Sequence, residues 1–176
     1  MNGFLSPLDR GELKYPFPVH CRFQRIELPA RRAYYELAGQ PADPRRVLVV
    51  CGYWGQGPIL RVVRTLLMVD PGLRVWVVCG ENARACAQSR QAFRDNPNVQ
   101  VHGTVPSLLP FLEECACVVT KPGISTLLEA HAAGRKIFLL KGMPVAEDNN
   151  ARYALRNFGA SWFNRDSFAN WRNAMA

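Results

Sequence analysis

A strand-to-helix turn in the second half of the chain carries the residues best suited to hold a phosphate. The stretch Lys121-Pro122-Gly123-Ile124-Ser125-Thr126-Leu127-Leu128-Glu129 follows an apolar run, and its Pro-Gly pair stops that run before a helix expected over 125–133. A helix amino terminus offers unbonded N–H groups and a positive dipole end, and the hydroxyls of Ser125 and Thr126 add donors. These groups predict an anion site. Glu129 lies about one turn further on, where a carboxylate can accept both hydroxyls of a ribose.

The same residues also have an explanation that needs no ligand. Ser125 would cap the helix, and Glu129 would only complement the helix dipole. The residues alone leave both explanations open.

A glycine-rich loop follows the first apolar run of the chain. Gly52-Tyr53-Trp54-Gly55-Gln56-Gly57 lies between a strand expected over 47–51 and a helix expected over 58–69. Glycine lets a backbone approach a phosphate closely, but a tight strand-to-helix turn needs glycine too, so ligand contact and a structural turn both remain open. The loop is neither a Walker loop nor a dinucleotide Gly-x-Gly-x-x-Gly.

Three further loops carry polar groups at expected strand ends. In Cys79-Gly80-Glu81-Asn82 the chain leaves a strand sharply at Gly80, and Asn82 is expected first to cap the following helix. In Gly103-Thr104-Val105-Pro106 the exposed backbone can hydrogen-bond a base edge. The stretch 142–151 holds acids and amides that suit sugar hydroxyls, although such side chains are as common in solvated loops and caps.

The pattern of elements brings these loops together. From Val47 onward, short apolar runs alternate with helical spacings, which predicts an α/β domain: a Rossmann-like, doubly wound parallel sheet over 47–176. In such a sheet, ligands sit beyond the carboxyl ends of the strands, so all these loops line one edge. The expected strands are 47–51, 75–79, 99–102, 116–120, 136–140 and 161–163, and the expected helices are 58–69, 83–94, 108–114, 125–133 and 148–157.

Residues 1–46 differ from the rest of the chain. They hold six prolines and little periodicity, and only 30–38 has a helical pattern. We expect an interdomain linker or arm packed on the domain.

Composition narrows the partners. The 176 residues suit one soluble domain, and a net charge of +8 favours anionic partners, either a membrane surface or a phosphate ligand. The basic residues are scattered and no zinc finger or RNA-recognition motif occurs, so nucleic acid is not expected. Most of the six cysteines lie in or beside apolar runs, which predicts core thiols in a reduced, cytoplasmic chain without a metal. We expect neither a membrane span nor a signal peptide.

The stretch Lys121–Ala130 resembles the C-terminal domain of glycosyltransferase family 28. That family includes the diacylglycerol galactosyl- and glucosyltransferases and the peptidoglycan N-acetylglucosaminyltransferase. Its pattern is Lys-Pro-Gly-Gly-x-Thr-x-x-Glu-Ala, and here only the second glycine differs, being Ile124. The other matching stretches are the glycine loop at Gly52, Val78–Asn82, Gly103–Val105 and Pro144–Ala151, and upstream Phe17–Phe23, which resembles the interdomain stretch of full-length enzymes.

The resemblance implies the C-terminal half of a GT-B fold and a UDP-sugar as substrate, with no cofactor and no metal. It implies inverting transfer of a hexose to a lipid-type acceptor, on the cytoplasmic side and peripheral to a membrane. The general base lies in the N-terminal domain of such enzymes, so no catalytic residue is assigned here, and an acceptor-binding domain or partner subunit is implied. The implied donor contacts are Gly55, Gln56, Gly57, Ser125 and Thr126 at the diphosphate, Val105 at the uracil, Glu129 at the ribose, Glu147 and Asn150 at the hexose, and Gly52, Gly80, Asn82 and Gly123 in the same loops.

Two departures from the family pattern stand out. Ala146 replaces a glutamine that often contacts the hexose, so the sugar is left open. Tyr53 and Trp54 add bulk to a loop that is usually small, and they either narrow the phosphate site or stack on a ligand. Two other functions also remain open: a non-catalytic nucleotide-sugar-binding subunit that needs a partner acceptor domain, and a UDP-sugar epimerase of related fold.

Overall fold

The computed structural model describes residues 28–141 and 147–175, except for the side chains of 28–31. The expectations for Phe17–Phe23, Cys21 and 142–146, including Ala146, therefore lie outside the described residues. The elements are α2 (Leu28–Glu36), β1 (Asp43–Val50), α3 (Ile59–Val69), β2 (Arg74–Val78), α4 (Ala83–Ala92), β3 (Val99–His102), α5 (Leu109–Glu114), β4 (Cys115–Thr120), α6 (Ile124–Ala132), β5 (Lys136–Leu139), α7 (Asp148–Asn157), β6 (Ser161–Trp162) and α8 (Arg165–Ala174).

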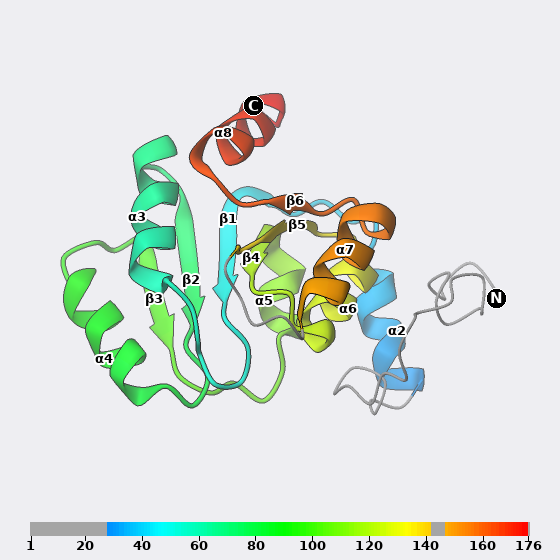
Figure 1. Cartoon of the computed structure of the whole chain (residues 1–176), viewed down its shortest axis with the longest axis horizontal. Helices are drawn as coiled ribbons and strands as arrows, with labels where there is room; N and C mark the ends of the chain where they lie inside the picture. Colours follow the sequence, from blue (N-terminus) through cyan, green and yellow to red (C-terminus); the bar gives the residue numbers. More distant parts are fainter. Residues whose placement is uncertain (1–27, 142–146, 176) are drawn as a thin grey trace.

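The six strands form one sheet in which every neighbouring pair is parallel. Their order is β3-β2-β1-β4-β5-β6, and it reverses between β1 and β4. Figure 1 shows α3 and α4 at one side of the molecule and α2, α6 and α7 at the other. This order is that of the Rossmann fold, and its reversal opens a crevice between the two central strands at their carboxyl ends. The predicted doubly wound parallel sheet is confirmed.

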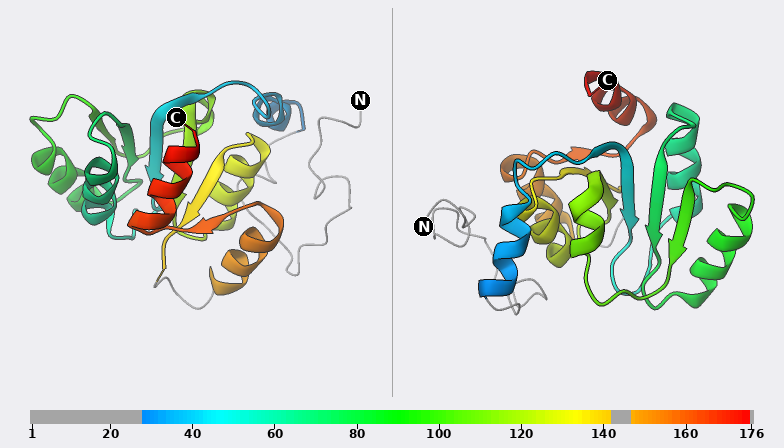
Figure 2. Two further views of the ribbon diagram at one scale, coloured as in Figure 1. Left: turned by 90° about the horizontal axis from the view of Figure 1, so that it is seen from above. Right: turned by 180° about the vertical axis from the view of Figure 1, so that it is seen from behind.

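The central strands are apolar along their whole length because the sheet is buried on both faces. In β1, Leu48 and Val50 join the core cluster that also contains residues of α2, α5, α6 and α7. The alternate residues Val47 and Val49 join the cluster that contains residues of α3, α4 and α8. Because successive strand side chains point to opposite faces, each face needs its own apolar set. Figure 2 shows the helices on both sides of the sheet from two further directions.

The packed structure begins earlier in the chain than the expected strand at Val47. Strand β1 starts at Asp43, and the side chains of Tyr34, Tyr35 and Leu37 are buried in the core. The buried guanidinium of Arg135 donates to the Gln40 carbonyl (3.1 Å) and also to the Leu112 carbonyl (2.7 Å), which ties the segment after α2 to α5. The sequence of this stretch does not reveal its burial, because prolines and arginines interrupt the apolar pattern and the residues it contacts lie far away in the chain.

Helix α8 was not expected from the sequence. Its apolar residues are few, and Phe168 and Trp171 carry most of its packing. Phe168 is fully buried, and its ring centroid lies 5.5 Å from that of Phe138 on β5 and 5.6 Å from that of Trp171. The helix starts in a capping box in which Asn164 and Ser167 bond each other's backbone N–H. Tertiary aromatic contacts, rather than a long amphipathic pattern, hold this helix.

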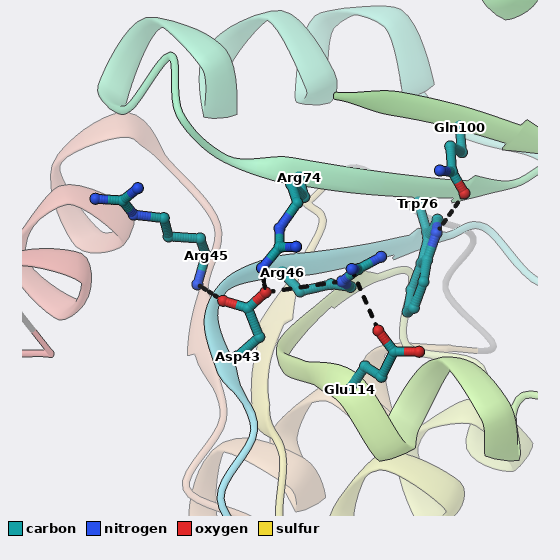
Figure 3. A network of polar contacts seen from close by, with 7 residues as sticks. All are labelled: Asp43, Arg45, Arg46, Arg74, Trp76, Gln100 and Glu114. Atoms are coloured by element: carbon teal, nitrogen blue, oxygen red, sulfur yellow. Dashed lines mark hydrogen bonds and ion pairs between the residues drawn. The ribbon is translucent and has the colours of Figure 1, made fainter. Parts of the chain in front are cut away.

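A polar network lies at the amino-terminal side of the sheet, where β1 and β2 begin (Figure 3). The guanidinium of Arg46 lies 4.1 Å from the ring centre of Trp76 and forms an ion pair of 3.2 Å with Glu114. The Trp76 indole N–H donates to Gln100 at 2.8 Å, and Asp43 pairs with Arg74. These contacts join β1, β2, β3 and α5 through residues that precede the carboxyl ends of the strands, so we assign them to the fold.

Candidate functional site

A cavity of about 550 Å³ opens at the carboxyl ends of the central strands. Its size lies in the range of small-molecule sites, and its place at the strand-order reversal is where open α/β sheets bind ligands. The loops after β1, β2, β3 and β4 contribute to it, together with α6. Its lining residues are Val50, Gly52, Tyr53, Trp54, Val78, Gly80, Thr104, Val105, Leu108, Lys121, Gly123, Ile124, Ser125, Thr126 and Glu129.

The amino end of α6 forms one wall of the cavity. Gly123 is the N-cap residue, in an extended conformation and without a side-chain cap bond, and α6 begins at Ile124. Ser125 is therefore inside the first turn, which contradicts the explanation in which Ser125 caps the helix. Both Ser125 and Thr126 line the cavity. The helix dipole and the first-turn N–H groups favour an anion at this wall.

Glu129 lies one turn further along α6 and also lines the cavity. Its side chain is only 2% exposed, and the Tyr34 hydroxyl lies 3.5 Å from its Oε1 atom. Tyr34 in turn lies 3.2 Å from the Ser107 hydroxyl. A carboxylate that served only the helix dipole would be expected at the surface, whereas this one is buried and faces a cavity. Its placement suits a ligand with hydroxyl donors.

Lys121 and Glu147 form an ion pair beside the cavity. The Lys121 ammonium lies 2.6 Å from Glu147 Oε1, and the two side chains are 16% and 15% exposed. The Glu147 Oε2 atom is buried and has no hydrogen bond within the described part of the chain. Asn150 donates to the Pro122 carbonyl at 3.0 Å. Glu147 and Asn150 thus lie against the β4–α6 turn, next to the cavity rather than in its wall.

Lys121 is a site residue that we did not assign from the sequence. Its aliphatic part passes over Gly52, since a Cβ atom added at Gly52 would lie 2.5 Å from the Lys121 Cε atom. Its ammonium, which is paired with Glu147, also lies beside the glycine loop and the amino end of α6 at the same cavity, an arrangement that suits a phosphate. Lys121 is the first residue of the stretch that resembles family 28, so the sequence contains a signal for this residue. For Tyr34, which is 95 residues from Glu129, the sequence carried none.

The glycine loop packs against the loop that follows β2. A Cβ atom at Gly55 would lie 1.9 Å from the Cys79 carbonyl oxygen, and one at Gly80 would lie 2.0 Å from the Tyr53 carbonyl oxygen. Asn82 joins this contact, because its amide donates to the Gly55 carbonyl at 3.2 Å while its oxygen caps α4. The predicted capping role of Asn82 is confirmed. Glycine is required here for loop-to-loop packing, whatever the loop binds.

We predict that Gly80→Ala destabilises the domain much more than Gly159→Ala does. Both glycines have a left-handed backbone, with φ of 58° and 61°, but an added Cβ meets backbone at Gly80 and nothing within 4 Å at Gly159. The shared conformational cost is about 1–2 kcal/mol. The excess measured for Gly80→Ala by urea unfolding reports the loop contact. Equal losses for the two variants would show that the loops do not touch.

The predicted donor residues thus fall into two groups. The structure gathers one group in the cavity wall: Gly52, Gly80, Val105, Gly123, Ser125, Thr126 and Glu129. The other group lies outside this wall: Gly55 is buried against the β2–α4 loop, Gln56 and Gly57 are exposed, Asn82 caps α4, and Glu147 and Asn150 contact the β4–α6 turn.

The described cysteines are core residues, as predicted. Cys51, Cys79, Cys86, Cys115 and Cys117 are all buried and free. Burial raises the pKa of the Cys51 thiol to about 12, so this thiol is protonated at neutral pH. Across residues 28–141 and 147–175 there is no group of three or more His, Cys, Asp or Glu that could hold a metal. No helix in that part of the chain is long and apolar enough to span a bilayer.

Known proteins with similar sequences are lipid glycosyltransferases. No family model matches the chain. It is 30% identical over 170 residues to a probable monogalactosyldiacylglycerol synthase 2 of Oryza sativa subsp. japonica, covering 92% of this chain and 36% of the relative. It is 28% identical over 148 residues to the processive diacylglycerol beta-glucosyltransferase of Bacillus pumilus, covering 82% of this chain and 37% of the relative. The chain therefore spans little more than a third of the length of these relatives.

A solved structure shows the same fold. The crystal structure of MurG from Acinetobacter baumannii aligns with a TM-score of 0.59 and 18% identity, covering 93% of this chain and 48% of MurG. The parallel sheet, its strand order and this alignment agree with one another. Together with the relatives, they show that the chain belongs with the glycosyltransferases of family 28 and corresponds to the C-terminal, Rossmann-like half of their GT-B fold.

Proposed function

We propose that this domain binds a UDP-sugar in the cavity at the carboxyl ends of β1 and β4. It would then be the donor half of an inverting, metal-independent glycosyltransferase that moves a hexose to a lipid acceptor. The observation that carries the proposal is the convergence of three features on one cavity: the amino end of α6, the ammonium of Lys121 and the buried carboxylate of Glu129. The first two suit a diphosphate, and the third suits a ribose.

Each group in the cavity would have a role in binding the donor or stabilising the leaving UDP, and none of these roles requires a metal ion. Helix dipole, N–H groups and Lys121 would stabilise the charge that develops on UDP as the sugar departs. Val105 lines the same cavity, and its backbone would meet the base edge. The Glu147 Oε2 atom, which has no hydrogen bond within the described residues, would accept a hydrogen bond from a hexose hydroxyl. Asn150 would contact the same hexose. In the glycine loop, Gln56 and Gly57 would approach the diphosphate through their backbone, whereas the N–H and carbonyl of Gly55 already form hydrogen bonds with Gly52 and Asn82.

The acceptor would be bound by a part of the enzyme outside this domain. The matched relatives carry nearly two thirds of their length outside the region that this chain covers, and their names place diacylglycerol among their reactants. We therefore propose that an acceptor-binding domain or partner subunit completes the cleft, at the surface of a membrane. Helices α3 and α4 support an anionic surface as partner, because together they carry Arg61, Arg64, Arg84 and Arg90 and no acidic residue. Residues 1–46 would lead from that half into this domain, with Tyr34, Tyr35 and Leu37 packed in its core.

The competing function is a binding subunit that performs no chemistry. The cavity fits this function as well, because the groups identified in its wall are suited to hold a donor and no general base is assigned among them. Only a partner that supplies the other half would then restore transfer.

The expected result is that the purified chain binds UDP and transfers no sugar. Calorimetry should detect UDP at millimolar concentration or below, with weaker binding of ADP, since Val105 would read the base. Incubation with UDP-galactose and diacylglycerol in vesicles containing an anionic lipid should yield no glycolipid and no altered UDP-sugar. An absence of UDP binding would contradict the donor site. Glycolipid synthesis by this chain alone would contradict the half-enzyme, and an isomerised UDP-sugar would identify an epimerase.

A further inference from the structure

Two aromatic side chains stand exposed at the mouth of the cavity. Tyr53 is 59% exposed and Trp54 is 65% exposed, and both line the cavity. Within the described residues, the other large hydrophobic side chains with comparable exposure are Met68 and Met175, and neither lines it. Exposed aromatic surface is unfavourable in water, so its concentration at a ligand cavity points to a ligand that covers it.

The loop holds this pair in place before any ligand arrives. Tyr53 and Trp54 pack edge to face, with ring centroids 5.0 Å apart. Their backbone is anchored on both sides, because the Gly55 N–H donates to the Gly52 carbonyl at 3.0 Å and the Glu81 N–H donates to the Tyr53 carbonyl at 2.7 Å. An anchored backbone and a contact between the two rings reduce the conformational entropy that is lost when a ring stacks on a ligand.

The anchor also joins the pair to the loop expected to hold the base. Glu81, which bonds the Tyr53 carbonyl, accepts a hydrogen bond of 2.8 Å from the Thr104 hydroxyl. Thr104 precedes Val105, and both line the cavity with Trp54. The loops after β1, β2 and β3 thus form one connected rim. Most of the groups suited to phosphate and ribose come from the β4–α6 turn and α6.

We propose that Trp54, supported by Tyr53, stacks on the uracil ring of the donor while the Val105 backbone reads the base edge. This inference rests on the proposed function and adds a residue that selects for an aromatic base. Stacking of a base on an aromatic side chain strengthens binding about 5- to 150-fold. Because Trp54 stands at an open rim, we expect an effect near tenfold.

The test compares UDP with 5,6-dihydrouridine diphosphate, which keeps the hydrogen-bonding edge but has no aromatic plane. The parent chain should bind UDP about tenfold more tightly than the dihydro probe. Trp54→Ala should lose that difference, and Trp54→Phe should recover part of it. The parent chain and the two Trp54 variants should bind inorganic pyrophosphate with equal affinity. Met68→Ala is the matched control, since Met68 is also 65% exposed but lies outside the cavity wall.

Fluorescence gives a second readout. UDP should quench the emission of exposed Trp54, and Trp54→Phe should lose this quenching.

The possible failures can be told apart. A parent chain that binds neither UDP nor pyrophosphate overturns the donor site itself. Equal binding of UDP and the dihydro probe by a parent chain that does bind UDP overturns only the stacking. If Trp54→Ala leaves UDP affinity unchanged but weakens UDP-galactose, the ring faces the hexose, and the assignment to the base is wrong.

Discussion

Glu129→Gln is expected to weaken UDP binding about tenfold or more while leaving the domain folded. The buried Glu129 carboxylate would accept two hydrogen bonds from the ribose diol, each worth about 1.5–3 kcal/mol because the acceptor is charged. The amide retains part of this energy, and each lost 1.4 kcal/mol lowers affinity about tenfold. Calorimetry with UDP measures the loss, and circular dichroism checks the fold.

The control for this variant is a ligand without the diol. 2′,3′-Dideoxy-UDP should bind the parent chain and Glu129→Gln equally. Tyr34→Phe, which removes the hydroxyl 3.5 Å from Oε1, should weaken UDP binding less than Glu129→Gln does. If Glu129→Gln binds UDP as the parent does, the ribose assignment is wrong. The carboxylate would then serve only the fold, with an effect of about 0.3–1 kcal/mol on helix stability.

Phe168→Ala is expected to lower the free energy of unfolding by about 3–5 kcal/mol, the usual cost of truncating a buried aromatic side chain. Phe168 is fully buried among Phe138, Phe163 and Trp171, so the cavity left behind has rigid aromatic walls that collapse poorly. Since small domains are stable by only about 5–15 kcal/mol, this loss is a large fraction of the total. Urea unfolding measures it.

Met175→Ala provides the comparison at the end of α8, because Met175 is 48% exposed and its truncation should cost little. UDP affinity of folded Phe168→Ala should match that of the parent, since Phe168 belongs to the core of α3, α4 and α8, whereas Glu129 stands on α6 against the other face. A small stability loss for Phe168→Ala would mean that α8 is not fastened to the sheet in the way described.

The sequence predicted the fold wherever burial acts on both faces of a strand. Runs such as Val47–Val50 are apolar throughout because each face of the sheet meets its own helices, and that pattern is readable without coordinates. Helix α7 was placed at its observed bounds, and Gly159 marks its end. Helix α8 was not predicted because it is stabilised by contacts of Phe168 with Phe138 and Phe163. These two residues lie before the helix in the chain, so they add nothing to the pattern within it.

The sequence also identified the loops that meet, because in a parallel sheet all strand ends of one kind lie at one edge. The chemical types of Ser125, Thr126 and Glu129 and their spacing on one helix were local facts, so the wall of the cavity could be predicted from them.

Only the tertiary structure decided which polar groups face the cavity and which hold the loops around it. Gly55 and Asn82 turn out to fasten one loop to the next, and Lys121 pairs with Glu147 across 26 residues. Tyr34 reaches Glu129 from a segment that the sequence showed only as an arm. Such pairings depend on strand order and on the path of each loop, which are set by packing between distant residues. Local spacing reports the kinds of groups that a sheet edge offers, whereas their partners are fixed only when the β1–β4 crevice forms.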